Sequence, residues 1–186
     1  MPQPWTKLRS TPRAEFTIFS IREDRNVSPR TGREHDFYVL DCANWVNVIA
    51  VTPDQQLVLV EQFRHGTEAV ELEIPGGVMD RHETDPVVTA VRELREETGY
   101  EGRNARVLGS IRPNPAFMSN TCHTVLIEDC RLVHPVEFDH GEDIVTRLCP
   151  LDETPRLVAT GKIRHALVVV GLAYFDLWQR GLLPRQ

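Results

Sequence analysis

Three glutamates on one side of a predicted helix are the residues in this chain best suited to chemistry. Glu93, Glu96 and Glu97 lie in the segment RELREE, and with about 100° between successive helical residues they share an arc of roughly 100°. Like charges this close destabilise a bare helix, so the arc requires cations, which Arg92 and Arg95 supply in part. A divalent metal ion would supply more, and carboxylate oxygens without His or Cys ligands favour Mg²⁺ or Mn²⁺. The alternative is a solvated helix face held by Arg–Glu ion pairs.

The helix that carries these glutamates has recognisable ends in the sequence. Asp85 is a suitable N-cap residue, Pro86 suits the first helical position, and Gly99 permits a left-handed stop. The pattern therefore predicts a helix over residues 86–98. Its apolar residues fall on an arc that turns away from the acidic arc, so one side of the helix is expected to pack on the core and the other to carry the carboxylates; the apolar residues are Val87, Val91 and Leu94.

Elsewhere, short apolar runs separated by turn residues predict strands, and two further segments predict helices. Strands are expected at 15–22, 35–40, 45–51, 57–64, 71–74, 107–108, 122–127 and in a segment that ends near 150. Pro75, Gly76 and Gly77 are expected to stop the strand before them. Helices are expected at 151–160 and from Ile163 to Leu177. We expect residues 1–42 to form a small antiparallel β appendage that starts as a proline-rich arm, and 43–186 to form the main domain.

Length, net charge and cysteine content limit the classes of protein to which the chain can belong. The 186 residues suit one domain with a small appendage, and a net charge of −6 argues against a nucleic-acid partner. No signal peptide and no apolar run near the ~20 residues of a membrane span are present, so a cytoplasmic protein with no membrane partner is expected. The four cysteines form no CxxC pair and are expected to be small buried hydrophobes: Cys42, Cys122, Cys130 and Cys149.

The glutamates belong to a longer motif. The stretch GGVMDRHETDPVVTAVRELREETGY resembles the Nudix box, G-x5-E-x7-R-E-U-x-E-E-x-G-U, in which U is aliphatic or bulky. The fixed positions are filled by Gly77, Glu83, Arg92, Glu93, Leu94, Glu96, Glu97, Gly99 and Tyr100. One departure is an eighth residue between Glu83 and Arg92, which we place near Thr84, in the loop before the helix. The ligands on the helix are then unaffected.

This resemblance implies a Nudix-type α/β/α sandwich with a mixed central sheet and an enzyme that uses Mg²⁺ (or Mn²⁺). It implies that Glu93, Glu96, Glu97 and the backbone carbonyl of Gly76 bind the metal. Arg92 would orient the glutamates through charge-assisted hydrogen bonds, with a plain surface ion pair as the alternative. For the general base, the resemblance leaves Glu93 and Glu142 open, and Glu142 has the alternative of an exposed acidic turn.

The flanking sequence resembles the branch of Nudix enzymes that act on ADP-ribose and nucleoside diphosphate sugars. The stretch LVLVEQFRHGTEAVELEIPGG places Gln62 and Arg64 at a strand end, where Arg64 would contact phosphate or the terminal ribose, or form a strand-end salt bridge instead. The segment RPNPAFMSN resembles a substrate-side loop, with Arg112, Asn114 and Phe117 as candidate contacts. In this branch the N-terminal β region is exchanged across a homodimer, which is therefore expected.

The resulting prediction is a pyrophosphohydrolase. It would hydrolyse ADP-ribose or a nucleoside diphosphate sugar, a small-molecule partner, to a nucleoside monophosphate and a sugar phosphate. A second possibility is a hydrolase of nucleoside triphosphates or dinucleotides. A third is a non-catalytic sensor of an ADP-ribose-type ligand, which the three intact glutamates and the negative net charge argue against.

Overall fold

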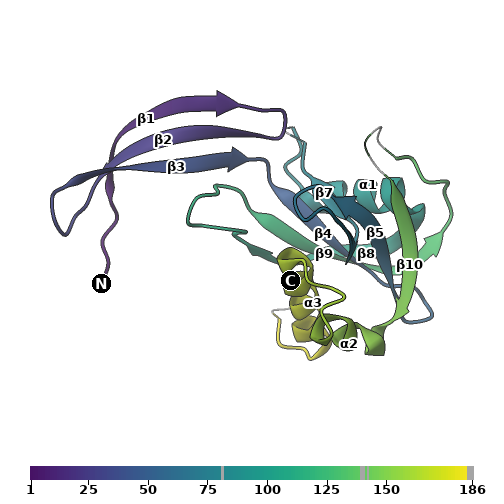
Figure 1. The fold of residues 1–186 in the computed structure, drawn as a ribbon. Coiled ribbons are helices and arrows are strands. Elements are labelled where there is room, and N and C mark those ends of the chain that lie inside the picture. The colour runs from purple at the N-terminus through teal and green to yellow at the C-terminus, as the bar shows by residue number, and fades with distance from the viewer. Residues whose placement is uncertain (81, 139–140, 142, 184–186) are drawn as a thin grey trace. The chain divides into compact units, whose positions relative to one another are not determined.

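A computed structural model describes residues 1–80, 82–138, 141 and 143–183 of the chain. Strands dominate the order of elements; one helix lies in the middle of the chain, and the others follow the last strand (Figure 1). In chain order the elements are β1 (Thr6–Glu15), β2 (Phe19–Val27), β3 (Glu34–Cys42), β4 (Trp45–Ala50), β5 (Gln56–Arg64), β6 (Ala69–Glu73), β7 (Gly76–Val78), α1 (Pro86–Thr98), β8 (Tyr100–Ile111), β9 (Cys122–Leu132), β10 (Ile144–Pro150), the 3₁₀ turn η1 (Leu151–Glu153), α2 (Thr154–Ala159) and α3 (Ala166–Gln179).

The chain folds into two compact units. The N-terminal unit comprises Met1–Asn44 together with Arg112–Thr121, and the second unit comprises Trp45–Ile111 together with Cys122–Gln186. The segment between β8 and β9 thus joins the N-terminal unit, where the Leu40 N–H donates to the carbonyl of Phe117 at 2.7 Å. The division into 1–42 and 43–186 stays a prediction.

The N-terminal unit is built on a three-stranded antiparallel sheet in the order β1-β2-β3. The predicted antiparallel appendage is confirmed, but the prediction of one strand over 15–22 is wrong. The Phe16 N–H donates to the carbonyl of Phe19 at 2.9 Å, and this turn joins β1 to β2. The expected arm is strand β1 from Thr6 on, in which Pro12 lies at a register shift on the sheet edge, where a strand tolerates proline.

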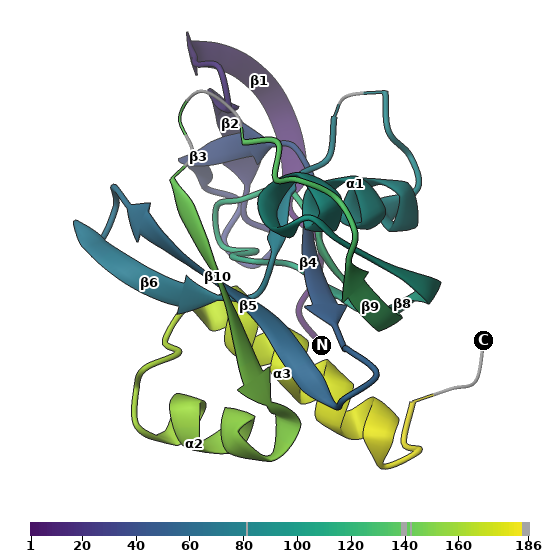
Figure 2. The same ribbon diagram turned by 90° about the vertical axis from the view of Figure 1, so that its right-hand side faces the viewer.

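The second unit contains a mixed sheet in the order β7-β4-β9-β8 and an antiparallel sheet in the order β10-β5-β6. Strands β4 and β9 run parallel, whereas β7 and β8 pair antiparallel with their neighbours. Figure 2 shows α1 on one side of these strands and α3 on the other. This arrangement confirms the predicted α/β/α sandwich with a mixed sheet.

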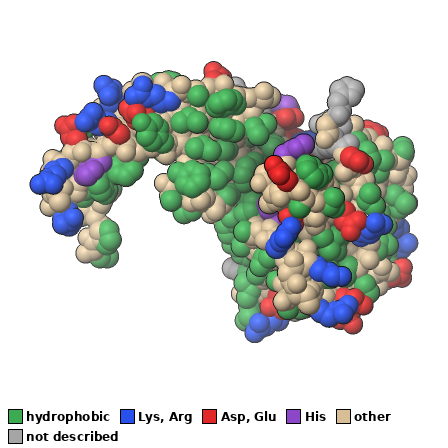
Figure 3. All heavy atoms as spheres, in the orientation of Figure 1, with side chains coloured by type: hydrophobic (Ala, Val, Ile, Leu, Met, Phe, Trp, Pro, Cys, Tyr) green, Lys and Arg blue, Asp and Glu red, His purple; other side chains and the backbone are tan. Residues whose placement is uncertain are grey.

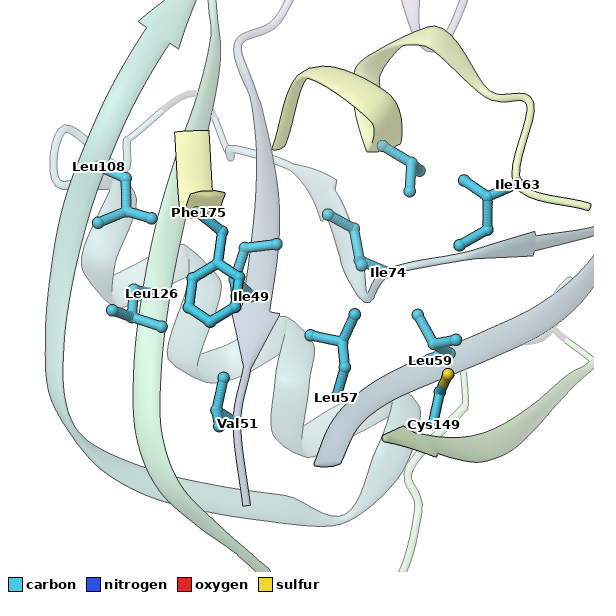
Figure 4. Packing of buried hydrophobic residues seen from close by; sticks show 11 residues of the cluster. Ile49, Val51, Leu57, Leu59, Ile74, Leu108, Leu126, Cys149, Ile163 and Phe175 are labelled. Atoms are coloured by element: carbon cyan, nitrogen blue, oxygen red, sulfur yellow. The ribbon is translucent and has the colours of Figure 1, made fainter. Parts of the chain in front are cut away.

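Alternation along β4 explains the two layers. Val46 and Val48 point to a buried cluster that includes Leu94 of α1. Ile49 points to the opposite cluster, where Phe175 of α3 packs beside it (Figure 4). Since successive side chains of a strand point to opposite faces, a strand with apolar residues on both faces must be covered on both sides.

Several strands are longer than the sequence predicted. The run expected at 107–108 is the 12-residue strand β8, and the one expected at 122–127 continues to Leu132 in β9. The added part of β8 is rich in polar residues, so it lacks the apolar pattern that predicts a strand. Such residues are tolerated because β8 is an edge strand, with register shifts and a left-handed Asn104 at φ 56°. The Gly76–Gly77 pair was expected only to stop a strand, but it forms β7, which pairs with β4.

The predicted helices are confirmed with small shifts. The expected 151–160 helix is η1 followed by α2, and α3 starts at Ala166, so that the buried Ile163 precedes it. The described residues form no helix of the length and apolarity that a bilayer crossing requires.

Three of the cysteines are buried, as expected for small hydrophobes, and Cys42 is half-buried. Burial raises the pKa of the Cys122 and Cys130 thiols to about 12. Large apolar side chains that stay exposed on the N-terminal sheet include Trp5, Leu8 and Phe37, and Figure 3 shows hydrophobic and charged side chains together on this unit.

Candidate active site

Helix α1 presents its glutamates to the sheet. Asp85 caps its N-terminus by accepting from the Val87 N–H, Pro86 occupies the first turn, and Gly99 closes the helix at φ 71°. The buried residues are Thr89, Ala90, Glu93, Leu94, Glu97 and Thr98. The prediction that the acidic arc faces away from the core is therefore wrong for two of the three glutamates, and Val91, expected in the core, is 41% exposed.

Glu97 reaches the start of strand β7. Its side chain is buried, with the residue 2% exposed, and Oε2 accepts a hydrogen bond from the Gly76 N–H at 3.1 Å. Gly76 itself pairs with Asn47 of β4 and lies so close to the Val46 carbonyl that a Cβ would collide with it. The glycine thus lets the strand backbone approach both β4 and the helix, and it brings a backbone segment of β7 beside a buried carboxylate.

Glu93 lies over the second glycine of β7. The residue is 8% exposed, and a Cβ on Gly77 would overlap its carboxylate atoms. Only glycine leaves room for the carboxylate at this place. The two buried carboxylates, one helical turn apart, therefore both lie against the Gly76–Gly77 backbone, and this proximity was not evident from the helix alone.

Arg92 holds the glutamates together. Its Nη1 lies 3.0 Å from Glu93 Oε1 and 3.0 Å from Glu96 Oε2, so both carboxylates lie on one nitrogen. Burial alone would lower the pKa of Arg92, but its hydrogen bond with Glu83 and the neighbouring charge of Glu93 raise it above its ordinary value. The guanidinium therefore stays charged and can orient the glutamates, the role predicted for it.

Glu83 reaches the helix despite the extra residue in the preceding loop. Its Oε2 accepts from the Asp80 N–H at 2.9 Å, from Thr89 Oγ1 at 2.9 Å and from Arg92 Nη2 at 3.2 Å. Hydrogen bonding to Arg92 lowers the pKa of this carboxyl to about 2. Thr89 was not predicted as a partner of Glu83, because their contact depends on how the loop between them closes.

The donor set has the chemistry of a hard-cation site. The predicted ligands are carboxylate oxygens of Glu93, Glu96 and Glu97 with the carbonyl of Gly76, which suit Mg²⁺ or Mn²⁺ better than zinc. Within the described part of the chain, no group of three or more His, Cys, Asp or Glu side chains is placed to hold a metal ion, and Arg92 Nη1 contacts both Glu93 and Glu96. The buried pair against the glycine backbone nevertheless fits a cation better than an apolar partner, because buried carboxylates require positive charge.

Arg64 at the end of β5 forms a salt bridge, which is one of the two roles that the sequence analysis considered for it. Its Nε and Nη2 donate to the two carboxylate oxygens of Glu73, each at 2.9 Å. Gln62 lies two residues earlier on the same strand, paired in register with Glu71 of β6 and Ile144 of β10. Substrate contacts by Gln62 and Arg64 stay predictions.

Sequence reasoning missed the cluster around Glu73. His165 Nδ1 lies 3.9 Å from Glu73 Oε2, and Arg164 binds Glu71, whose pKa it lowers. The arginine and the glutamate are 93 residues apart, so no local spacing joins them. The alternation of Glu71 and Glu73 along one strand is the only sequence signal that two carboxylates share a face.

Three further candidate residues come from the segment between β8 and β9. The N-terminal unit contains Arg112, Asn114 and Phe117. Arg112 Nη1 donates to the Ser119 carbonyl at 3.0 Å, and the backbone carbonyl of Asn114 accepts from the Met118 N–H at 2.8 Å. Their contacts with substrate stay predictions. Glu142, the alternative base, lies outside the described residues.

Comparison with known proteins shows the family to which the chain belongs. The NUDIX domain model matches residues 43–169. The chain is 30% identical over 133 residues to the ADP-ribose pyrophosphatase of Bacillus subtilis, with 71% of each chain covered. It is 27% identical over 171 residues to the GDP-mannose pyrophosphatase of Escherichia coli, covering 87% of this chain and 88% of the relative. A solved structure of an ADP compounds hydrolase shares the fold, with a TM-score of 0.85, 22% identity and 97% of each chain covered.

The chain therefore belongs to the Nudix family. It is a hydrolase that acts on phosphorus-containing anhydrides, and the region where α1 meets the Gly76–Gly77 backbone is its candidate active site.

Proposed function

We propose that the chain hydrolyses the pyrophosphate bond of ADP-ribose or of a nucleoside diphosphate sugar, in a reaction that depends on Mg²⁺ or Mn²⁺. The products are a nucleoside monophosphate and a sugar phosphate. The observation that carries this proposal is the pair of buried carboxylates, Glu93 and Glu97, held against the β7 backbone beside Arg92. The names of the two pyrophosphatase relatives support the substrate class.

The residues that would hold the metal are Glu93, Glu96, Glu97 and the carbonyl of Gly76. A cation bound there neutralises diphosphate charge and makes a coordinated water more acidic. Arg92 keeps the carboxylates oriented through its paired contacts with Glu93 and Glu96. This pre-organisation matters because positioning and electrostatic stabilisation supply most of the rate in phosphoryl transfer.

The hydrolytic step needs a carboxylate base. Water oxygen forms a bond to one phosphorus, the bond from that phosphorus to the bridging oxygen breaks, and the bridging oxygen leaves with the other phosphate. The proton of the attacking water passes to the base, for which Glu93 and Glu142 are the two candidates. Glu93 is buried against Gly77.

Turnover of a substrate panel tests the proposal. ADP-ribose, GDP-mannose, ATP and a dinucleoside diphosphate are each incubated with the protein in Mg²⁺ and in EDTA, and the products are separated from the substrate by anion-exchange chromatography and quantified. We expect ADP-ribose or GDP-mannose to be hydrolysed fastest, and only with metal. Turnover in EDTA, or turnover of ATP alone, contradicts the proposal.

We further propose that the chain acts as a homodimer through its N-terminal β region. Support comes from the apolar side chains that this sheet leaves exposed, among them Trp5, Leu8 and Phe37, since exposed apolar patches mark interaction sites.

A further inference from the structure

Strand β6 carries two buried carboxylates, each bound by an arginine from another element. Glu71 and Glu73 alternate with Leu72, so they lie on the same face of the strand. Arg164, just before α3, donates from Nε to Glu71 Oε2 at 2.9 Å, and from Nη2 to Oε1 at 2.9 Å. Arg64 makes the same two-bonded pair with Glu73. The two pairs have the same chemistry, but Arg164 lies just before α3 whereas Arg64 lies at the end of β5.

The Arg64–Glu73 pair fixes the orientation of the guanidinium. Glu73 takes Nε and Nη2, two of the five N–H donors of the group. Two parallel charge-assisted hydrogen bonds set the plane of the guanidinium as well as its position. The side chain of Glu73 is 3% exposed and that of Arg64 is 42% exposed. The pair therefore joins a buried carboxylate to a more exposed guanidinium.

A short stretch of chain connects this ion pair to the candidate metal site. Glu73 precedes Gly76 by three residues, which span at most about 11 Å of backbone. Gly76 is the residue whose N–H binds Glu97 at 3.1 Å. The Arg64–Glu73 pair and the carboxylates of α1 are thus joined through one short connection from β6 to β7, within reach of one nucleoside diphosphate derivative.

We propose that Glu73 is a positioning residue that fixes Arg64 for contact with the diphosphate part of the substrate; this rests on the proposed function. A flexible arginine loses conformational freedom when it binds a ligand, and that loss weakens binding. Glu73 orders the side chain before the substrate arrives. Because the arginine fork matches phosphate oxygens in pairs, its orientation decides whether the match is made.

A double-mutant cycle tests whether Glu73 acts through Arg64. Glu73→Gln, Arg64→Ala and the double variant are compared with the wild type in kcat and KM for the better of ADP-ribose and GDP-mannose with Mg²⁺. We expect Arg64→Ala to lower kcat/KM by about 10- to 100-fold and Glu73→Gln to lower it by about tenfold, mainly through a higher KM. In the Arg64→Ala background, Glu73→Gln should change kcat/KM by less than about twofold. An equal loss in both backgrounds overturns the proposal.

Glu71→Gln is the matched control. It removes the same charge from the same buried strand face and breaks an equivalent arginine pair. We expect Glu71→Gln and Glu73→Gln to lower the Tm similarly, while Glu71→Gln keeps kcat/KM within about twofold of the wild type. If Glu71→Gln loses as much catalytic efficiency as Glu73→Gln, the effect is a loosening of β6 and the positioning role is refuted.

The activity of the wild type distinguishes a failure of this proposal from a failure of the proposed function on which it rests. If the unmodified protein hydrolyses neither ADP-ribose nor GDP-mannose with Mg²⁺, the proposed function fails and the role of Glu73 falls with it. If the wild type is active and the cycle shows no coupling, only the role of Glu73 is wrong.

Discussion

Arg92 is the residue on which the acidic site depends, since it contacts Glu83, Glu93 and Glu96 at once. A single guanidinium that binds three carboxylates keeps them close together despite their mutual repulsion. The Nudix motif gave this set of residues from the sequence. Burial was not predictable from the helical wheel, because the wheel does not show that the glycine backbone of β7 admits carboxylates where side chains would otherwise pack.

Glu97→Gln tests the metal-ligand role at the residue scale. The change keeps the shape of the side chain and removes its charge, so kcat should fall by about 100-fold or more, because a metal ligand acts in the transition state. Steady-state kinetics across a range of Mg²⁺ concentrations measure the effect. Glu153→Gln, at an exposed glutamate of η1, serves as the control and should keep wild-type kinetics. Wild-type turnover in Glu97→Gln would show that Glu97 is not a ligand.

The Glu83 carboxyl makes stability depend on pH. Its pKa in the folded chain is about 2, below the ~4.3 of an unfolded chain, so the folded state favours the charged form. The stabilisation is fully present above about pH 5 and is lost as the pH falls toward 2; its size is on the order of 3 kcal/mol.

Urea unfolding of the wild type and Glu83→Gln at several pH values measures this contribution. The wild type should be the more stable at pH 7, and the difference should shrink steadily between about pH 5 and pH 2. A difference in unfolding free energy that stays constant over this range would mean that the Arg92 pair does not set the pKa.

At the scale of elements, helix α1 was predictable and its surroundings were less so. Asp85, Pro86 and Gly99 act as the cap residues that their types suggested, because capping depends on local backbone geometry alone. Strand β7 was not predicted: its three residues form a strand only because β4 offers a partner, and pairing between distant segments leaves no local signal. The same reason explains the missed Glu71 and Glu73 pairs.

Gly77→Ala tests how α1 and β7 meet. The added Cβ would overlap the Glu93 carboxylate, the far end of a flexible side chain, so the side chain should move while the fold remains. We expect kcat/KM to fall by about tenfold or more, with little change in Tm.

Gly66→Ala is the control for this change, since a Cβ there meets no atom within 4 Å. It should leave kcat/KM near the wild-type value. Equal activity of Gly77→Ala and Gly66→Ala would contradict the assigned position of Glu93.

At the scale of the whole molecule, the strands of the second unit are covered by α1 on one face and α3 on the other. The α/β/α sandwich that the resemblance to the Nudix box implied agrees with this double cover. The division of the strands into two sheets was not predictable, because order and register depend on tertiary packing.

Phe175→Ala tests the contribution of α3. Phe175 is buried in the cluster with Ile49 and Leu126, and its truncation should cost about 3–5 kcal/mol in unfolding free energy. Urea unfolding measures the loss, and Phe117→Ala, at an exposed phenylalanine, should cost far less. Similar losses for the two variants would contradict the packing of α3.

The homodimer proposal predicts a mass of about twice that of the 21.2 kDa chain in sedimentation equilibrium. Leu8→Asp, on the exposed side of β1, should shift the mass toward one chain without changing the circular dichroism spectrum, because it buries a charge in an apolar interface. A wild-type mass of a single chain would contradict the proposal.

The most direct test of the central claim is to follow ADP-ribose by ³¹P NMR in the presence of the wild-type protein. With Mg²⁺, we predict that the two diphosphate resonances disappear and that those of AMP and ribose 5-phosphate replace them, whereas EDTA or Glu97→Gln leaves the diphosphate intact. Cleavage that proceeds equally in EDTA, or products other than two monophosphates, would contradict the assignment of the α1 carboxylates to metal-dependent pyrophosphate hydrolysis.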